Sequence, residues 1–290
     1  MLQTLRFIWK HPLNAGFPAW GIYKFFRWQI VSRLINGKHK CSFTEYTKLL
    51  IQKGMTGATG NIYCGLLEYE DMSFLLHLLR ANDLFVDIGA NVGVYTVLAS
   101  GEIGANSISI EPIPTTFSHL SENITLNDIS SKVVAFNIGL GSKPGKLFFT
   151  KDKDTVNHVS TEADKHTMEV QVNTLDNILQ TQSPILIKID VEGFETEVLK
   201  GSSSTLSNPA LKAIIIELNG SGNRYGYDEN TIHDHLLIQG FQPFSYAPQN
   251  RTLHLLPTYN NLNTIYIRDL DFVASRVKEA RKIKVGRHLI

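Results

Sequence analysis

Several features that mark other protein classes are missing from this sequence. Cysteine occurs only as Cys41 and Cys64, which excludes a disulfide framework and a four-cysteine metal site. We expect both to be reduced packing residues. No apolar run approaches the roughly 18–20 residues that cross a bilayer, so we expect no membrane-spanning helix. The apolar stretch before Pro12 is interrupted, so we expect no secretory signal and a cytoplasmic location.

A large net charge is also missing, although the charges are unevenly distributed. The 290 residues hold 28 Lys and Arg against 27 Asp and Glu. Residues 1–53 hold nine bases and one acid, residues 54–269 hold thirteen bases and twenty-four acids, and residues 270–290 hold six bases and two acids. An acidic middle flanked by two basic ends indicates three parts with different roles.

The basic first segment also holds all three tryptophans of the chain. Apolar residues recur near the helical period over 19–36, which predicts an amphipathic helix that the pair Asn36 and Gly37 would end. Two interpretations of residues 1–53 are open. Their aromatic and basic side chains could contact a membrane surface or a lipid substrate. Alternatively, the segment is a helical cap whose aromatic side chains pack on the main domain.

The middle of the chain alternates between strand and helix patterns. Short apolar runs predict strands at 84–88, 106–110, 133–138, 185–189 and 213–218, with two further candidates at 241–245 and 264–268. Helical patterns follow at 94–103, 114–126, 194–200 and 229–238. This alternation predicts an α/β fold in which helices cover both faces of a parallel sheet. Residues 145–173 break the rhythm and predict a hairpin around the polar stretch 151–167, of the kind that often lines a substrate pocket.

The first strand ends in a glycine loop, at the sheet edge where such folds bind ligands. Asp87 is followed there by Gly89, Asn91 and Gly93, and Glu111 ends the second strand. A carboxylate at the end of the second strand can accept hydrogen bonds from both hydroxyls of a ribose. The glycine spacing differs from the G-x-G-x-x-G of dinucleotide sites. A carboxylate before the loop repels a pyrophosphate but suits the ammonium of a methionine moiety. The residues therefore favour S-adenosylmethionine over NAD as the ligand. A third interpretation is that the glycine loop binds no ligand and serves only packing.

Four segments, in this order, resemble the FkbM family of methyltransferases. They read FVDIGANVGVYTVLAS at 85–100, IEPIPTTFSHLSENITLN at 110–127, VNTLDNIL at 172–179 and IKIDVEGFETEVLKG at 187–201. The resemblance implies the class I, Rossmann-like methyltransferase fold, with a seven-stranded, mostly parallel sheet that has one antiparallel strand at its end. It also implies methylation of hydroxyl oxygens on sugars, polyketides and related small molecules.

The resemblance assigns site residues by position. The glycine loop corresponds to the family's contacts with the methionine half of S-adenosylmethionine, and Glu111 corresponds to its ribose ligand. Asn137 and Ile138 correspond to positions that flank the adenine. Asp190 lies where class I enzymes line the methyl-transfer site.

The resemblance and the charge pattern together divide the chain into three parts. A basic, aromatic helical segment is expected at 1–60, the S-adenosylmethionine-binding domain at 61–270, and a basic helix at 271–290. The basic tail also allows a nucleic-acid interpretation. We consider nucleic acid an unlikely partner because the catalytic domain is acidic.

A hydroxyl nucleophile needs a group that takes its proton. Asp190, Glu192 and His158 are the candidates for this catalytic role. Asp190 and Glu192 alternate along an extended chain, so they would point to opposite sides unless the following glycine turns the chain. Lys188 could pair with Asp190. Glu192 could instead cap the following helix, and His158 could be a solvated loop residue. Glu217 could form a wall of the pocket or be a buried carboxylate paired with a neighbour.

No metal site is expected, because His233 and His235 are two residues apart and would not share a helix face. The sequence thus predicts an enzyme that transfers a methyl group from S-adenosylmethionine to a hydroxyl of a small molecule or glycan. Two alternatives remain: an NAD-dependent Rossmann enzyme, and a non-catalytic cofactor-binding protein attached to membranes through its basic ends.

Overall fold

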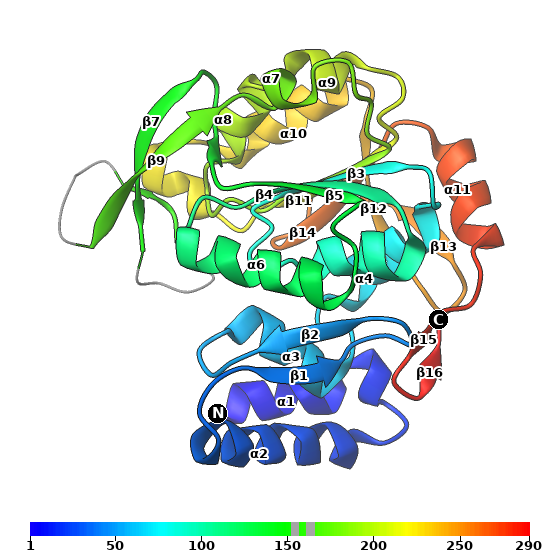
Figure 1. Cartoon of the computed structure of the whole chain (residues 1–290). Helices are drawn as coiled ribbons and strands as arrows, with labels where there is room; N and C mark the ends of the chain where they lie inside the picture. The colour runs from blue at the N-terminus through cyan, green and yellow to red at the C-terminus, as the bar shows by residue number, and fades with distance from the viewer. Residues whose placement is uncertain (152–156, 161–165) are drawn as a thin grey trace.

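The computed structural model describes residues 1–151, 157–160 and 166–290 (Figure 1). Its main sheet has the strand order β13-β12-β14-β11-β10-β3-β4-β5. These strands are, in chain order, β3 (Leu84–Ile88), β4 (Asn106–Ile110), β5 (Val133–Phe136), β10 (Leu186–Ile189), β11 (Ala213–Glu217), β12 (Gln242–Ala247), β13 (Thr252–Leu255) and β14 (Asn263–Ile267). The run from β11 to β5 is parallel throughout.

All seven expected strands are therefore present in this α/β fold. The antiparallel strand β14 pairs with both β11 and β12. The structure adds β13, which pairs antiparallel with β12 and gives the sheet an eighth strand. Since β3 lies between β4 and β10, the strand order reverses beside β3, and ligands bind at such a reversal in open α/β sheets.

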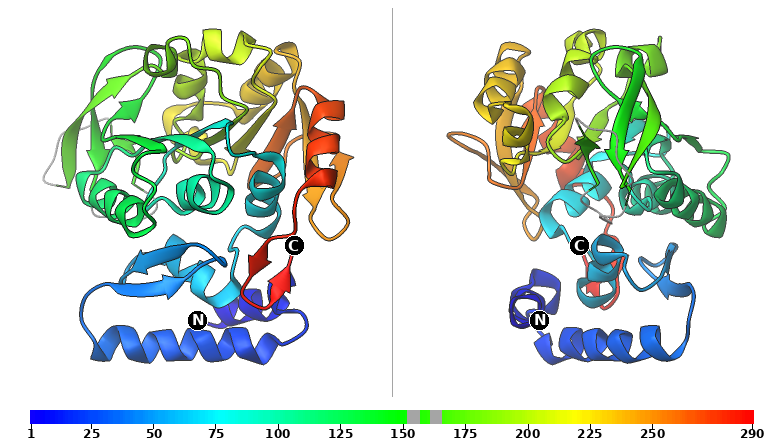
Figure 2. Two further views of the ribbon diagram at one scale, coloured as in Figure 1. Left: turned by 45° about the vertical axis from the view of Figure 1, so that its right-hand side comes forward. Right: turned by 90° about the vertical axis from the view of Figure 1, so that its left-hand side faces the viewer.

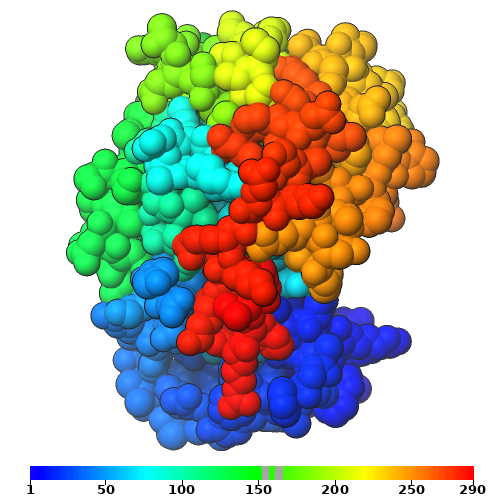
Figure 3. All heavy atoms as spheres, turned by 90° about the vertical axis from the view of Figure 1, so that its right-hand side faces the viewer, coloured from blue at the N-terminus to red at the C-terminus, as the bar shows by residue number. Residues whose placement is uncertain are grey.

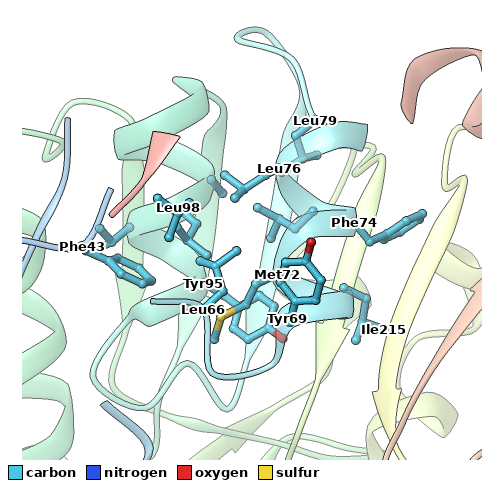
Figure 4. Close-up of a cluster of buried hydrophobic side chains, with 14 of the residues drawn as sticks. Phe43, Leu66, Tyr69, Met72, Phe74, Leu76, Leu79, Tyr95, Leu98 and Ile215 are labelled. Carbon is cyan, nitrogen blue, oxygen red and sulfur yellow. The ribbon is translucent and has the colours of Figure 1, made fainter. Parts of the chain in front are cut away.

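Helices cover both faces of the sheet, as the alternating pattern predicts. One face packs against α7 (Leu175–Leu179), α8 (Glu195–Lys200), α9 (Ser203–Ser207) and α10 (Glu229–Ile238). The other packs against α4 (Tyr69–Leu78), α6 (Pro114–Leu126), α11 (Leu270–Glu279) and the segment after β3. Figure 4 shows part of this second core, including Phe74 of α4, Leu98 and Ile215 of β11.

The segment after β3 is less regular than the helix expected at 94–103. It begins as the short α5 (Val94–Thr96) and continues as a π-helix, η2 (Val97–Ile103). Such π-helical turns are rare and occur frequently next to functional sites. Here the turn directly follows the glycine loop.

The excursion at 145–173 forms the expected hairpin. Strand β7 (Gly145–Thr150) pairs antiparallel with β9 (Thr167–Asn173). With β6 (Gly139–Leu140) and β8 (Val159–Ser160) they make a small sheet, in the order β6-β9-β7-β8. Most of the polar stretch expected between the two long strands lies outside the described residues.

The N-terminal residues form a unit below the α4 and α6 face of the main sheet (Figures 1 and 2). It comprises α1 (Leu2–Lys10), η1 (Pro12–Asn14), α2 (Pro18–Leu34), the antiparallel pair β1 (His39–Ser42) and β2 (Lys48–Ile51), and α3 (Thr56–Cys64). Helix α2 matches the helix expected at 19–36. Throughout the described residues, no helix is both long and apolar enough to span a membrane.

The basic tail is only partly helical, which corrects the expected helix at 271–290. Helix α11 ends at Glu279 because Ala280 adopts an extended conformation, with φ −57° and ψ 142°. The chain then forms a small hairpin of β15 (Lys284–Val285) and β16 (His288–Leu289). Val285 is buried there. The hairpin reaches from the main domain onto the N-terminal unit (Figure 3), where the N–H of Glu45 donates to the Lys284 carbonyl at 3.1 Å.

Candidate active site

A cavity of about 280 Å³ lies at the carboxyl ends of the central parallel strands. Its walls come from the loop after β3, the end of β4, α3, the segment after β10 and the last residue of β11. The expected site residues on these walls are Asp87, Gly89, Asn91, Glu111, Ile138, Asp190 and Glu192. The sequence therefore identified this cavity, although Gly93, Asn137 and His158 are not among its described wall residues.

Close approach of two backbones explains the glycine at position 89. Its φ is +77°, and a Cβ built on it would lie 1.8 Å from the backbone oxygen of Asp190. Gly93 has a φ of +84°, and a Cβ there would lie 2.4 Å from Leu120. Any larger residue at either position would displace the loop from the neighbouring segment. Gly89 thus lets the end of β3 lie against the end of β10, and Gly93 lets the loop lie against α6.

Asp87 is buried, and its carboxylate already has partners within the protein. Its Oδ2 accepts from the Thr96 N–H at 3.1 Å and from the Thr96 hydroxyl at 2.7 Å. These bonds satisfy a donor at the start of the helical segment after the loop. Burial raises the pKa of Asp87, against the opposing effect of Lys188. Asp87 therefore fixes the loop in addition to lining the cavity.

Glu111 is held between the loop and the end of β4. One carboxylate oxygen accepts from the Asn91 N–H at 3.0 Å and the other from the Ile113 N–H at 2.9 Å. Burial raises the pKa of Glu111 to about 7 in spite of these hydrogen bonds. Each oxygen has a second lone pair, so this wall residue can still accept hydrogen bonds from a ligand.

Asn137 and Ile138 follow β5 but act differently. The Asn137 amide donates to the backbone oxygens of Glu111 and Pro112, at 2.8 and 3.0 Å. It therefore positions the segment that carries Glu111. Ile138 lines the cavity itself and offers an apolar surface that suits a flat aromatic ring.

Comparison with known proteins identifies the family. The family described as "Methyltransferase FkbM domain" matches residues 87–243. This chain belongs to the FkbM methyltransferase family. The matched range contains the glycine loop, Glu111 and the carboxylates after β10.

Curated relatives of this FkbM-family chain are methyltransferases by name. Hexuronic acid methyltransferase AglP of Haloferax volcanii is 28% identical over 154 residues, covering 52% of this chain and 62% of that protein. Methyltransferase sdnD of Sordaria araneosa is 28% identical over 171 residues, covering 46% of this chain and 65% of that protein. Methyltransferase 1 of Beauveria bassiana is 30% identical over 146 residues, covering 41% and 58%. The matches thus span about three-fifths of each relative's length.

Three carboxylates meet on one wall of the cavity in this FkbM-family chain. Asp190, Glu192 and Glu217 each offer an oxygen atom, and these atoms all lie within 4.8 Å of one another. Glu192 joins Asp190 on one side because its φ is +55° and that of Gly193 is +100°, which turns the chain out of the strand direction. The expected alternation of the two side chains therefore does not apply. We call these residues the carboxylate trio.

Glu192 and Glu217 of the carboxylate trio hold protons more tightly than ordinary surface acids do. Burial and the neighbouring charge of Asp190 raise the pKa of Glu192 to about 7. Burial, followed by the charges of Asp190 and Glu192, raises the pKa of Glu217 to about 8. Closely spaced carboxylates cannot all ionise at low cost. At this spacing the trio suits either a shared proton or a divalent cation, although the sequence predicted no metal site.

Lys188 pairs with Asp190, as expected. The lysine is only 4% exposed, and its Nζ lies 2.7 Å from Asp190 Oδ2. Burial alone would lower the pKa of Lys188, but Asp190, Glu68 and Asp87 outweigh it and raise the pKa. The Lys188 charge also lies 4.7 Å from the centre of the Tyr95 ring. Lys188 thereby holds Asp190 in an ion pair, and the raised pKa values of Glu192 and Glu217 make those two the candidate proton acceptors.

Asn157 lines the cavity, whereas the next residue, His158, is not among the described wall residues. The His158 backbone joins β7, since its N–H donates to the Thr150 hydroxyl at 3.0 Å and its carbonyl accepts from the Thr150 N–H at 2.9 Å. The role of His158 as the catalytic base stays a prediction.

Tyr95 and Glu195 lie in or beside the cavity wall, and no sequence pattern would have identified them. Tyr95 donates its hydroxyl to Glu68 Oε2 at 2.6 Å, which ties α5 to the chain before α4. Glu195 accepts from the Val191 and Gly193 N–H groups, both at 3.2 Å, and holds the turn that carries Glu192. Glu195, rather than Glu192, thus makes the local bonds that the sequence assigned to a helix cap.

Proposed function

We propose that this protein transfers a methyl group from S-adenosylmethionine to a hydroxyl oxygen of a small molecule or glycan. One observation carries the proposal: the glycine loop and Glu111 share a single cavity with the carboxylate trio. Membership of the FkbM methyltransferase family supports it. The printed name of the relative AglP, a hexuronic acid methyltransferase, supports a glycan among the acceptors.

The residues on the cavity walls fit S-adenosylmethionine by their chemistry. Glu111 presents carboxylate lone pairs suited to ribose hydroxyls, and Ile138 presents an apolar surface suited to the adenine. The remaining wall is acidic, which favours a cationic ligand and opposes the pyrophosphate of NAD. When bound, the cofactor supplies the methyl group on a positively charged sulfur.

The protein's own contribution is to align the acceptor and remove its proton. Methyl transfer is an in-line displacement, so holding the acceptor oxygen in position supplies much of the rate. Glu192 and Glu217 have pKa values raised towards neutrality, which is the range in which a general base works best. We propose that Glu192 or Glu217 accepts the proton of the acceptor hydroxyl, while Lys188 holds Asp190 in place.

Calorimetric titration tests the cofactor directly. The wild-type protein is expected to bind S-adenosylhomocysteine, and Glu111→Ala is expected to weaken binding by about ten- to a hundredfold, the usual loss for a charge-assisted hydrogen bond. Glu169→Gln is a matched control, because Glu169 is an exposed acid of β9 that pairs with Lys146. An unfolding curve of each variant confirms that it is folded.

Two further measurements separate the proposal from its two alternatives. A thermal shift with NAD and none with S-adenosylhomocysteine would replace this proposal by a dinucleotide enzyme. Cofactor binding without methyl transfer to any component of a cell extract, followed with methyl-labelled cofactor by mass spectrometry, would instead support the non-catalytic interpretation.

A further inference from the structure

Helix α2 is apolar on two opposite sides. Phe25 and Trp28 face inward and are each 7% exposed. Tyr23, Phe26 and Ile30 recur at helical spacing on the other side and are 51%, 47% and 58% exposed. A helix that is apolar all round is normally buried on all sides. Its outward face has no covering element among the described residues.

Helix α1 and the connection to α2 extend this apolar surface. The two helices lie side by side at the end of the molecule farthest from the main sheet (Figures 1 and 2). Trp9 is 55% exposed, Phe17 66% and Trp20 42%. Exposed aromatic residues gathered on one face mark an interaction site. We call the outward side chains of α1, α2 and their connection the aromatic face.

Basic residues accompany the aromatic face without acidic partners. A second cavity, of about 430 Å³, has Lys24, Arg27 and Lys40 on its walls together with Trp20 and Trp28. None of these three cations forms an ion pair within the part of the chain that the structure describes. We call them the free cations.

Arg287 of the tail adds a further charge at this cavity. Its guanidinium lies 4.7 Å from the centre of the Trp20 ring, and the preceding Gly286 lines the cavity. Burial, together with the nearby Arg287, lowers the pKa of Lys24. A negatively charged ligand in the cavity would relieve this repulsion.

We propose that the aromatic face docks this protein on an anionic lipid bilayer, with a phosphate-bearing headgroup entering the cavity of the free cations. Interfacial aromatics beside lysine and arginine suit the boundary between headgroups and acyl chains. Exposed aliphatic side chains such as Ile30 and Leu34 have no complement on a nucleic-acid backbone, so the apolar component favours lipid over RNA. Asn61 of α3 lines both cavities, so the cavity of the free cations adjoins the proposed acceptor site.

Vesicle binding by the full chain tests the proposal without any catalytic assay. The probe is phosphatidylcholine vesicles with or without about 30% phosphatidylglycerol. All three tryptophans belong to the N-terminal unit, so their emission and its quenching by brominated acyl chains report insertion. We expect at least about tenfold tighter binding to the anionic vesicles, falling with added salt.

Two variants separate the apolar and charged contributions. Tyr23→Ser/Phe26→Ser/Ile30→Ser removes the aromatic stripe, and Lys24→Gln/Arg27→Gln/Lys40→Gln removes the free cations. Each is expected to weaken binding about tenfold and to leave S-adenosylhomocysteine affinity and the unfolding temperature near wild type. The matched controls, Ile238→Ser/Leu255→Ser and Lys143→Gln/Lys151→Gln/Lys278→Gln, change exposed residues elsewhere and are expected to bind as wild type.

Five results would overturn the proposal. Four of them are no binding to either vesicle, equal binding to both, equal losses in the control variants, and tighter binding to single-stranded RNA than to anionic vesicles. Inorganic phosphate is included as a competitor. If millimolar phosphate displaces the protein completely, the cavity is a free-phosphate site and the lipid assignment is wrong.

Discussion

Glu192 and Glu217 both combine burial with nearby negative charge, and both are placed to accept a proton. A general base works only when it is deprotonated. We therefore expect kcat/KM to rise with pH and to level off above about 7 to 8, where these two carboxylates lose their protons. Glu192→Gln or Glu217→Gln is expected to reduce kcat by roughly a hundredfold or more and to remove this rise.

Glu197→Gln provides the control for this pH profile. Glu197 lies near the trio in sequence but bonds to Ser142 and Lys200, so its loss should leave the profile unchanged. Two results would contradict a shared proton. One is a full rate in both trio variants. The other is a rate abolished by EDTA and restored by magnesium, which would make the trio a cation site.

The sequence predicts the position of a site residue well when that residue lies at the end of a strand. Gly89 and Glu111 end neighbouring strands, and the structure brings both to one cavity. The carboxylate trio was not predictable in this way. It depends on the positive φ of Glu192 and on the proximity of β11, and no local pattern encodes either feature. The chemical roles of all these residues stay predictions.

At the level of elements, the tail hairpin is joined to the main domain by a buried charge. The Arg281 guanidinium donates to Glu102 Oε1 at 2.6 Å, and the Glu102 side chain is fully buried. Removing one partner of a buried pair leaves an uncompensated charge. Arg281 itself is half exposed, so we expect Arg281→Ala to lower the free energy of unfolding by about 1–3 kcal/mol.

Urea denaturation measures this loss, and the adjacent Lys282→Ala is the matched control. Lys282 is exposed and without an ion pair among the described residues, so its change should stay within about 0.5 kcal/mol. Equal unfolding free energies for the two variants would show that the tail is not held by Glu102.

The tail also shows why element boundaries are harder to predict than element types. Helical periodicity identified α11 correctly, since Val273 and Val277 lie on one buried side. The same periodicity continues through Ile283 in the sequence. Ile283 is buried in the structure, but beyond the end of the helix, in the segment that leads to the hairpin. A buried residue at helical spacing does not reveal which partner buries it.

For the whole molecule, the sheet and its two helical layers followed from alternation along the chain. The N-terminal unit did not follow, because its inward and outward faces are both apolar. Periodicity alone left open whether its aromatic residues pack on the main domain or face outward. Phe25 and Trp28 pack inward, while Trp9 and Trp20 face outward. Phe25 meets Tyr63 of α3 and Trp28 meets His39 of β1, so these inward residues pack within the N-terminal unit. Contact of the outward residues with a membrane stays a proposal.

The acidic site gives the whole protein a pH-dependent stability. Five carboxylic acids around the cavity have a pKa raised mainly by burial, to about 7 or, for Glu217, about 8. They are Asp71, Glu111, Glu192, Glu195 and Glu217. In the unfolded chain these groups lose their protons near pH 4. The folded state holds more protons between these limits, so stability falls as the pH rises from about 4 and levels off above about 7 to 8, where the folded carboxylic acids have lost their protons.

We therefore expect the melting temperature of the ligand-free protein to fall as the pH rises from about 6 to 8 and to level off above about 8. Burial lowers the pKa of His11 and His77, and this destabilises the folded state only at lower pH. A cationic ligand favours ionised carboxylates, so the thermal shift with S-adenosylmethionine should grow over the same interval. S-adenosylhomocysteine lacks the sulfonium charge and is the matched control, with a smaller growth. A melting temperature that rises with pH, or equal growth for both ligands, would contradict the assignment of these acids to a cationic ligand.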